Sequence, residues 1–346
     1  MSEHKLQLNW DVIGHEPILH FLEKNLDNQS FAHAYLFVGP GKIGKTTVAK
    51  KFGNFVVCEQ FQRLSLNDTG VKLKNLGCGE CNTCRMYSKG LYADFHLLER
   101  EENDSGTLKQ NISVKQIREL HTHLNKRSFQ NSYKVVLIPE AETLSDGASN
   151  SLLKFLEEPT QQTMLILVAP DKNMVLPTIL SRCQVLQYSP VSRETIYQQL
   201  LNKDISKNEA WDMAALSAGR PTGAMQFAED RDFYFEYKEK ARGVLQLLSG
   251  GLADRLLNLE KMLGRTDQKR KALEILNILT SIYRDLQLLK VYQDDLVQHV
   301  FLHDELKSVG RENHAWHKKI KQVQEGINYV EHNVTPRLVL ETILIS

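Results

Sequence analysis

Gly39-Pro40-Gly41-Lys42-Ile43-Gly44-Lys45-Thr46 is the stretch of sequence that decides the fold. It fits the pattern Gly-x4-Gly-Lys-Ser/Thr, in which glycines let successive backbone N–H groups turn towards phosphate oxygens. The lysine of this pattern reaches the β- and γ-phosphates, and its last hydroxyl binds Mg²⁺. An apolar run at 35–38 precedes the loop and a helix-forming stretch follows it, so the helix dipole would face the anion. We predict a nucleotide site made of Gly39, Pro40, Gly41, Lys42, Ile43, Gly44, Lys45, Thr46 and Thr47.

The end of the next apolar run departs from what hydrolysis requires. A strand is expected at 135–138, followed by Pro139 and Glu140. Hydrolytic P-loop sites place an acidic residue there to hold Mg²⁺ through water, and usually a second carboxylate to activate the attacking water. Pro139 offers no ligand, which leaves Glu140 as a weak catalytic candidate, with a solvated strand end as the equal alternative. We expect ATP with Mg²⁺ to bind and to be hydrolysed poorly or not at all.

A cluster of cysteines forms the second signal. Three of them follow the spacing C-x2-C-x2-C and a fourth lies upstream, which together supply four soft ligands for a tetrahedral ion. Protein sulfurs would fill all four positions, so the site would be structural rather than catalytic. We predict a Zn²⁺ knuckle, with an iron–sulfur cluster as the rival, and we expect Cys183 to be a packed thiol. The predicted ligands are Cys58, Cys78, Cys81 and Cys84.

Length and composition narrow the class of protein. The 346 residues predict two or three domains, and 43 basic against 42 acidic residues give a net charge of +1. A net charge this close to zero does not by itself indicate a protein that binds nucleic acid. No apolar run reaches the ~18–20 residues of a membrane span. The polar N-terminus and the clustered cysteines in a reducing context lead us to expect a cytoplasmic protein without membrane partners.

Strands and helices alternate in the first half of the chain, which predicts an α/β fold with a mostly parallel sheet. Beyond about residue 190 only helical patterns remain, and an apolar stripe at 276–289 favours a helical-bundle core over a binding groove. We place domain edges near 190 and 235. The expected strands are 35–38, 135–138 and 165–168, and the expected helices of this half are 45–55, 114–124 and 149–156.

Several segments resemble the bacterial DNA polymerase III clamp-loader AAA+ family. They are the P-loop, the cysteine cluster, and the segments 33–37 (HAYLF), 149–159 (SNSLLKFLEEP) and 178–183 (TILSRC). The resemblance covers about 13–183, and more weakly extends to 219. It implies an AAA+ nucleotide-binding domain at 1–189 with the zinc insertion at about 58–90. A small helical lid domain at 190–235 and an all-α collar domain for oligomerisation at 236–346 would follow.

Departures from the family pattern indicate the type of subunit. A motor subunit would carry Asp-Glu after the second strand, a threonine after the third strand, and an arginine three residues past Gly219. This chain has Pro139-Glu140, Ala169-Pro170 and Thr222 at those places. Three hydrolysis elements are missing while the arginine that acts in trans, Arg182, is present, and this combination resembles delta-prime subunits. Those often have a degraded P-loop, whereas the P-loop here is intact.

The resemblance also implies partners and a role in replication. Arg182 would complete the ATP site of a neighbouring motor (gamma/tau) subunit in a hetero-pentameric ring that also contains the delta subunit. The ring would open the sliding clamp and load it onto primer–template DNA, which this chain would contact through phosphates. The chain would then be a component of the DNA polymerase III holoenzyme, a nucleotidyltransferase complex, without strong ATPase activity of its own.

Other classes of function remain as alternatives. The intact Lys45 and Thr46 fit an autonomous AAA+ ATPase or a gamma/tau-like motor subunit, although Pro139 and Thr222 oppose both. The P-loop also resembles that of thymidylate kinases, but the Asp-Arg pair such a kinase needs is not found after a central strand. A zinc-dependent DNA-binding adaptor without nucleotide chemistry is the third alternative.

Overall fold

The computed structural model describes residues 8, 10–61, 77–103, 106–126, 128, 133–160, 162–310 and 315–345. The chain divides into two compact units, Met1–Val191 and Ser192–Ser346, and each is described by itself. Among the described residues, no helix has both the length and the apolar character to cross a membrane. Part of the predicted zinc insertion, 62–76, lies outside the described residues.

A five-stranded parallel sheet forms the centre of the first unit, which confirms the predicted α/β class. In spatial order its strands are β2 (Phe95–Leu97), β3 (Lys134–Ile138), β4 (Thr163–Ala169), β1 (Ala34–Val38) and β5 (Gln184–Gln187). Parallel strands place all their carboxyl ends on one edge of the sheet, which we call the carboxyl edge, and all their amino ends on the other, the amino edge. The residues that follow β1, β3 and β4 therefore meet at the carboxyl edge.

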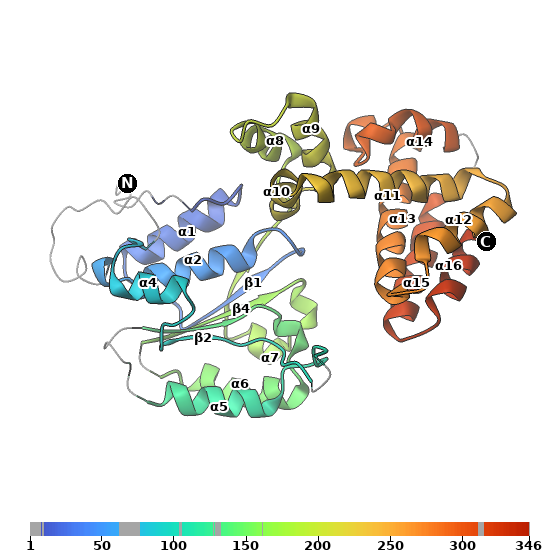
Figure 1. The fold of residues 1–346 in the computed structure, drawn as a ribbon. Helices are drawn as coiled ribbons and strands as arrows, with labels where there is room; N and C mark the ends of the chain where they lie inside the picture. The colour runs from blue at the N-terminus through green and yellow to red at the C-terminus, as the bar shows by residue number, and fades with distance from the viewer. Residues whose placement is uncertain are drawn as a thin grey trace. The chain divides into compact units, whose positions relative to one another are not determined.

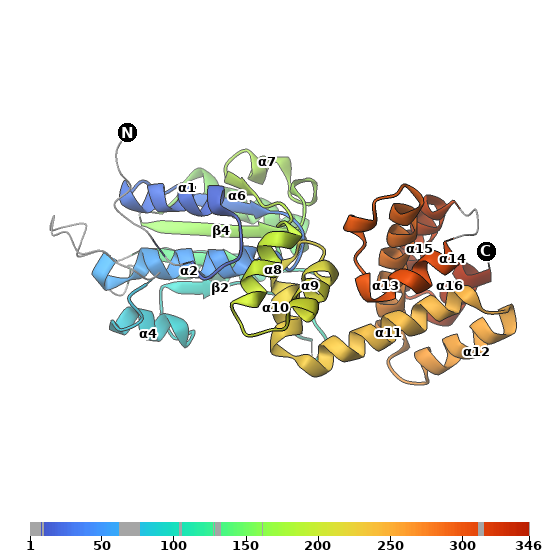
Figure 2. The ribbon, with the colours of Figure 1, turned by 90° about the horizontal axis from the view of Figure 1, so that it is seen from above.

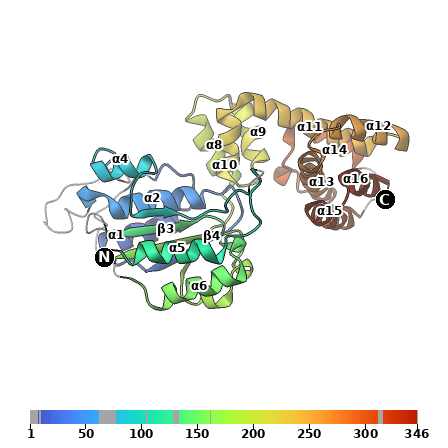
Figure 3. The same ribbon diagram turned by 60° about the horizontal axis from the view of Figure 1, so that its bottom comes forward.

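Helices cover both faces of this sheet (Figure 1). On one face, Tyr35 and Phe37 of β1 pack in a core with α1 (Glu16–Asp27) and α2 (Lys45–Val57). On the other face, the alternate residues Leu36 and Val38 pack with α5 (Val114–Leu124) and α6 (Asp146–Glu157). Figure 3 shows α5 and α6 side by side beneath the strands. Burial on both faces explains why the central strands read as continuous apolar runs.

Local capping sets where the helices begin. The Ser113 hydroxyl accepts the Gln116 N–H, and the Gln116 side chain accepts the Ser113 N–H, so a capping box starts α5 at the predicted residue. The Ser145 hydroxyl caps α6 at the Ala148 N–H, so that helix begins at Asp146 rather than at the predicted 149. The early start gives α6 three more residues at the carboxyl edge.

Two strands, β2 and β5, were not predicted from the sequence. Both lie at the edges of the sheet and contain only three and four residues. The sequence of β5 is QVLQ, and glutamines at both ends hide the strand from a search for apolar runs. The prediction that the strand at 165–168 ends the β series is therefore wrong, because β5 follows it and pairs with β1.

The second unit is helical, as predicted. Its main helices surround α13, whose side chains at Leu276, Leu279 and Ile282 are fully buried, so the apolar stripe at 276–289 belongs to the core. Helix α11 runs without a break through residue 235, and the division at that residue stays a prediction. The helices are α8 (Arg193–Leu201), α9 (Lys207–Leu216), α10 (Pro221–Glu229), α11 (Arg231–Ser249), α12 (Leu252–Leu263), α13 (Gln268–Lys290), α14 (His303–Val309), α15 (Trp316–Glu331) and α16 (Pro336–Ile345). Figure 2 shows this unit from above.

Candidate nucleotide and metal sites

The P-loop joins the carboxyl end of β1 to the first turn of α2. Its backbone needs glycine, because Gly39 and Gly44 have φ angles of 149° and 101°. A Cβ on Gly39 would lie 2.4 Å from the carbonyl oxygen of Tyr188, so no side chain fits there. Lys42 also has a positive φ of 60°, whereas a Cβ on Gly41 would meet open space. Successive backbone N–H groups of such a turn can point inward and form a concave site that binds an anion such as phosphate.

Lys45 lies against the loop that it terminates. Its side chain is 7% exposed, and its Nζ donates to the carbonyl oxygens of Gly39 and, at 2.6 Å, of Pro40. Burial lowers the pKa of Lys45, and the negative charge of Glu142 partly offsets this effect. Thr46 follows in the first turn of α2 and is half-buried, while Thr47 is exposed. The arrangement fits a phosphate-binding loop with a cation at its base.

The segment before α1 covers the loop, and sequence reasoning missed it. His15 Nε2 donates to the carbonyl oxygen of Ile43 at 2.9 Å, and its ring packs edge-on against Tyr188. Burial lowers the pKa of His15, which favours the neutral form of the ring. A Cβ on Gly14, whose φ is 76°, would lie only 2.7 Å from Val191. No motif in the sequence marks these residues, since their role depends on contacts across the fold.

Glu140, the weak catalytic candidate, is held by an arginine. Its Oε2 accepts from Arg100 Nε at 2.8 Å and its Oε1 accepts from Arg100 Nη2 at 3.3 Å. The two-point geometry of a guanidinium and a carboxylate fixes the orientation of both groups. Both carboxylate oxygens are thus paired with the guanidinium, while the side chain stays 43% exposed. Sequence reasoning missed Arg100 because it lies 40 residues before its partner.

Glu142 is a second carboxylate at the same edge that sequence reasoning passed over. It lies in the short 3-10 helix η1 (Ala141–Thr143) directly after β3. Its Oε2 is buried and has no hydrogen-bond partner among the described residues. Burial raises the pKa of Glu142, as does the charge of Glu140, while Lys45 lowers it. In the sequence, Glu142 is marked only by its position two residues after Glu140.

Arg182, the predicted trans arginine, follows the short helix α7 (Pro177–Leu180). Its Nη2 donates to Glu157 Oε1 at 2.9 Å, and its Nη1 donates to the carbonyl oxygen of Thr178 at 3.0 Å. The side chain remains 37% exposed. These bonds hold the guanidinium at the surface of the first unit without burying it.

The strand register separates Arg182 from the P-loop of its own chain. Gln184, the first residue of β5, pairs with Tyr35, and Gln187 pairs with Val38. Arg182 therefore lies at the amino edge of the sheet, whereas the loop begins at the carboxyl edge. The five residues of β1 span about 16 Å at ~3.3 Å each. The structure brings Glu140 and the P-loop to one edge and leaves Arg182 at the other.

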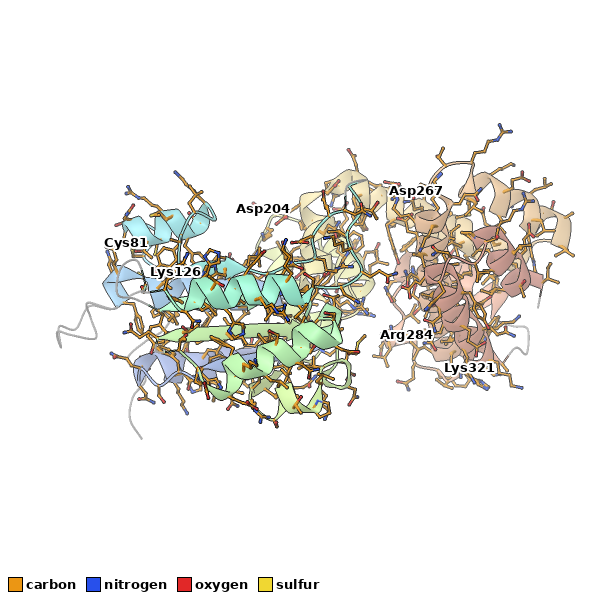
Figure 4. All side chains as sticks on the ribbon, turned by 90° about the horizontal axis from the view of Figure 1, so that it is seen from below. Cys81, Lys126, Asp204, Asp267, Arg284 and Lys321 are labelled. Carbon is orange, nitrogen blue, oxygen red and sulfur yellow. The ribbon has the colours of Figure 1, made fainter. Side chains whose placement is uncertain are left out.

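The four predicted metal ligands meet in one cluster at the start of the helix α4 (Asn82–Ser88), where Figure 4 labels the capping residue Cys81. The sulfur atoms of Cys58, Cys78, Cys81 and Cys84 all lie within 4.8 Å of one another. Four sulfurs at ~2.3 Å from a tetrahedral Zn²⁺ would be about 3.8 Å apart, so a small contraction fits the ion. The cluster could therefore hold a metal ion.

Hydrogen bonds and burial shift the pKa values of the cluster's thiols in different directions. Backbone N–H groups of Cys81 and Cys84 donate to the sulfurs of Cys78 and Cys81, at 3.2 and 3.4 Å. A hydrogen bond from the Cys84 thiol lowers the pKa of Cys58 to about 5, with further backbone donors acting in the same sense and burial opposing them. The same hydrogen bond raises the pKa of Cys84, and burial raises that of Cys78, so the shifts favour a thiolate at Cys58. Thiolates are the form that binds metal. By contrast, burial raises the pKa of Cys183 to about 12, as expected for a packed thiol.

The position of the cluster excludes it from phosphate chemistry. Cys58 caps the C-terminal end of α2, whose N-terminal residue is Lys45. Thirteen residues at ~1.5 Å each place the cluster about 20 Å from the P-loop. Glu59, the residue after Cys58, is hydrogen-bonded to α4, because its Oε1 accepts from the Thr83 hydroxyl at 2.7 Å. The cluster thus fastens α4 to α2 and fits a structural role.

Comparisons with known proteins show which families and proteins this chain is similar to. A family model described as "DNA polymerase III, delta subunit" matches residues 14–192, just over half of the chain. The DNA polymerase III subunit delta' of Pseudomonas aeruginosa is 32% identical over 198 residues, which cover 56% of this chain and 55% of that protein. The subunit delta' of Bacillus subtilis is 25% identical over 283 residues, covering 80% of this chain and 78% of the relative.

A motor-type protein is similar as well. The DNA polymerase III subunit tau of Bacillus subtilis is 32% identical over 186 residues, covering 54% of this chain and 30% of the relative. The delta' match in Bacillus extends over far more of both proteins than the tau match does. Similarity to tau is therefore confined to a smaller part of the chain.

Proposed function

The chain belongs to the DNA polymerase III delta subunit family, and from this premise we propose that it is the delta-prime-type subunit of a clamp loader. In that role it helps to load a sliding clamp onto primed DNA during replication. It joins motor (gamma/tau) subunits and a delta subunit in a ring of five, and lends Arg182 to the ATP site of a neighbouring motor subunit. Its own nucleotide site binds ATP and hydrolyses it poorly.

The position of Arg182 is the observation that carries this function. The side chain is exposed, held by Glu157, and separated from its own P-loop by the length of the sheet. A guanidinium placed in this way cannot reach the γ-phosphate of a nucleotide bound by the same chain. It is available to a second subunit, where an arginine finger that stabilises charge on the γ-phosphate accelerates hydrolysis by roughly 10³–10⁵.

The chain's own site supports binding more than turnover. The positive φ angles of Gly39 and Gly44 and the buried Lys45 support phosphate binding. When Mg²⁺–ATP is bound, the ion screens the phosphate charge. The carboxylate that would activate water, Glu140, is engaged by Arg100, and Pro139 offers no ligand beside it. A site that binds ATP without hydrolysing it would hold the ring in one conformation while the motor subunits hydrolyse their own ATP.

Zn²⁺ is the ion we propose for the cysteine cluster. Four sulfurs near tetrahedral spacing suit zinc, and the backbone donors around them stabilise thiolates without leaving an open coordination position. The ion would hold α4 against α2 and would take no part in the reaction. Zinc binding would therefore contribute to folding of the first unit.

ATP binding and turnover by the purified chain test this account of its own site. We expect the wild-type chain to bind ATP, measured by calorimetry, with no more than a trace of phosphate release over background. Lys45→Ala removes the cation from the base of the loop and should abolish binding, whereas Lys50→Ala changes an exposed lysine farther along α2 and should retain it. Robust turnover that disappears with Lys45→Ala would instead make the chain an ATPase in its own right.

The autonomous AAA+ ATPase remains the second candidate because the P-loop is intact. Its supporting observation is the burial of Lys45 against the loop carbonyls, which is the geometry of a working phosphate site. The ion pair between Arg100 and Glu140 opposes it. The turnover measurement described above separates the two.

A further inference from the structure

Trp211 lies at the surface of the second unit, on α9. It is 37% exposed, whereas Trp10 and Trp316, the other two tryptophans of the chain, are 4% and 3% exposed. A hollow of about 460 Å³ opens beside the Trp211 ring, and small-molecule and anchor pockets commonly measure about 300–1,000 Å³. An exposed tryptophan beside a hollow of this size is typical of a site that binds another molecule.

Three elements of the second unit form the walls of this hollow, which we call the Trp211 pocket. They are α8, α9 and the 3-10 helix η4 (Val300–Leu302). Helices α8 and α9 pack side by side (Figure 1). The lining residues are Tyr197, Lys207, Asn208, Trp211, Asp212 and Val300.

Contacts between α8 and α9 fix the aromatic wall of the Trp211 pocket. The Tyr197 ring meets the Trp211 ring edge-on, with the two centroids 5.4 Å apart. The Arg193 guanidinium lies over the Trp211 ring, 5.3 Å from its centroid. The same guanidinium donates from Nη2 to the carbonyl oxygen of Val297 at 2.6 Å, so it is held in place from its other side.

The wall formed by η4 is fixed by the residues that precede it. The N–H groups of Gln298 and His299 each donate to the carboxylate of the fully buried Asp285, both at 2.9 Å. The Gln298 side chain donates to the carbonyl oxygen of Leu216, at the end of α9, at 2.7 Å. Val300 is therefore held against α9. A pocket that exists before its ligand arrives loses little affinity to the ordering of its walls.

The charge at the rim of the Trp211 pocket is positive. Asp212 accepts from Lys238 Nζ at 2.9 Å, and Glu209, the acidic residue in the first turn of α9, is paired with Arg231. Both nearby carboxylates are thus neutralised. Lys207 is exposed and forms no ion pair with any residue that the structure describes. Lys207 also lies at the positive end of the α9 dipole, so the rim complements a negatively charged ligand.

These features suit a peptide better than single-stranded nucleic acid. Bases stack on open aromatic faces, and a phosphate backbone is followed by several cations along a groove. At the Trp211 pocket the ring already carries the Arg193 guanidinium, and Lys207 is the one unpaired cation among the lining residues described above. Tyr197, Trp211 and Val300 make most of the wall apolar, which suits an apolar side chain.

We propose that the Trp211 pocket docks an acidic segment of a partner protein, with one large apolar side chain in the hollow and a flanking carboxylate paired with Lys207. Tryptophan, tyrosine and arginine carry much of the binding energy at protein interfaces, and all three meet here. The segment gives the chain a protein contact in its second unit. The inference does not depend on the nucleotide site, and its failure leaves that site untouched.

A simpler explanation is that Trp211 only packs α9 against α8. A packing role affects the stability of the two helices and gives the chain no ligand. Lys207 separates the explanations, because it has no partner to lose and its substitution leaves the packing intact.

The test is a selection of peptides from a random phage library on the immobilised full chain, followed by fluorescence anisotropy with the selected peptides. We expect these peptides to combine Asp or Glu with a large apolar residue. Lys207→Glu replaces an attraction by a repulsion and should weaken their binding about fivefold or more. Trp211→Ala removes the main wall and should weaken it about tenfold or more. The matched controls are Lys321→Glu, an exposed lysine of α15, and Tyr292→Ala, which is 90% exposed, and both should bind as wild type does.

Each outcome decides between the explanations. Failure to select acidic peptides with an apolar residue overturns the proposal, as does peptide binding that Lys207→Glu leaves unchanged, whatever Trp211→Ala does to the melting temperature. Binding of an oligothymidylate, or self-association of the chain, that Lys207→Glu abolishes in the absence of peptide binding assigns the pocket to another occupant and also overturns it. Tryptophan emission gives a direct report, because only Trp211 is exposed. A selected peptide should shift this emission, and an unchanged spectrum would place the peptide elsewhere.

Discussion

Arg182→Ala is expected to lower the DNA-stimulated ATPase of a reconstituted clamp-loader ring several-fold while leaving this chain folded. The arginine is proposed to serve one motor site, and a finger contributes roughly 10³–10⁵ to the rate at the site it completes. The motor site that lacks the arginine stops hydrolysing ATP while the other motor sites continue. The total rate of ATP hydrolysis therefore drops several-fold rather than to zero. The measurement is phosphate release by rings assembled with wild-type or variant chain, at saturating ATP and primed DNA.

Stability gives no alternative explanation for such a loss. The ion pair of Arg182 with Glu157 joins side chains that are 37% and 52% exposed, and exposed pairs contribute about 0–1 kcal/mol. Lys172→Ala, an exposed cation in the connection between β4 and β5, is the matched control and should leave the rate unchanged. A ring that assembles normally with Arg182→Ala and hydrolyses at the wild-type rate would remove the trans role from this residue.

Cys81→Ser is expected to release zinc and to destabilise the first unit. Cys81 caps α4, and its sulfur accepts the Cys84 N–H. Serine is also a good N-cap, so the substitution keeps the cap and removes a soft metal ligand. Metal binding free energy is folding free energy. If about 3 kcal/mol is lost, the melting temperature should fall by about 6–12 °C, since 1 kcal/mol corresponds to ~2–4 °C in a domain of this size.

Two measurements check the zinc prediction. Metal analysis should find about one zinc per wild-type chain and less than half of that in Cys81→Ser. Cys183→Ser changes a half-buried free cysteine in the connection before β5 and should keep its zinc, because its thiol is not part of the cluster. A wild-type chain with less than half an equivalent of zinc would rule out the four-cysteine site. ATP binding should survive in Cys81→Ser wherever the unit stays folded, since about 20 Å separates the cluster from the P-loop.

The parts of the structure that depend on local chemistry could be predicted from the sequence. The P-loop between β1 and α2, the cysteine cluster and the start of α5 all follow from residue types at fixed spacing. The strands β3 and β4 were found because both of their faces are buried and they read as apolar runs. These features can be recognised in a single sequence because they depend on residues that lie close together along the chain.

The parts that depend on contacts across the fold could not be predicted. Arg100 and Glu140 are 40 residues apart, and only the sheet brings them together. The buried oxygen of Glu142 depends on the turn after β3 and on what packs over it. The short edge strand β5 has no apolar run to mark it, because glutamines occupy its ends. The sequence therefore located the site but not the ion pair that engages Glu140.

Loading of a sliding clamp onto primed circular DNA tests most directly whether this chain is a clamp-loader subunit. The assay compares motor and delta subunits mixed with the chain against the same mixture without it, and counts clamps retained on DNA after gel filtration. We predict that loading needs the chain and falls to background in its absence. Equal loading by motor and delta subunits alone would contradict the proposed function.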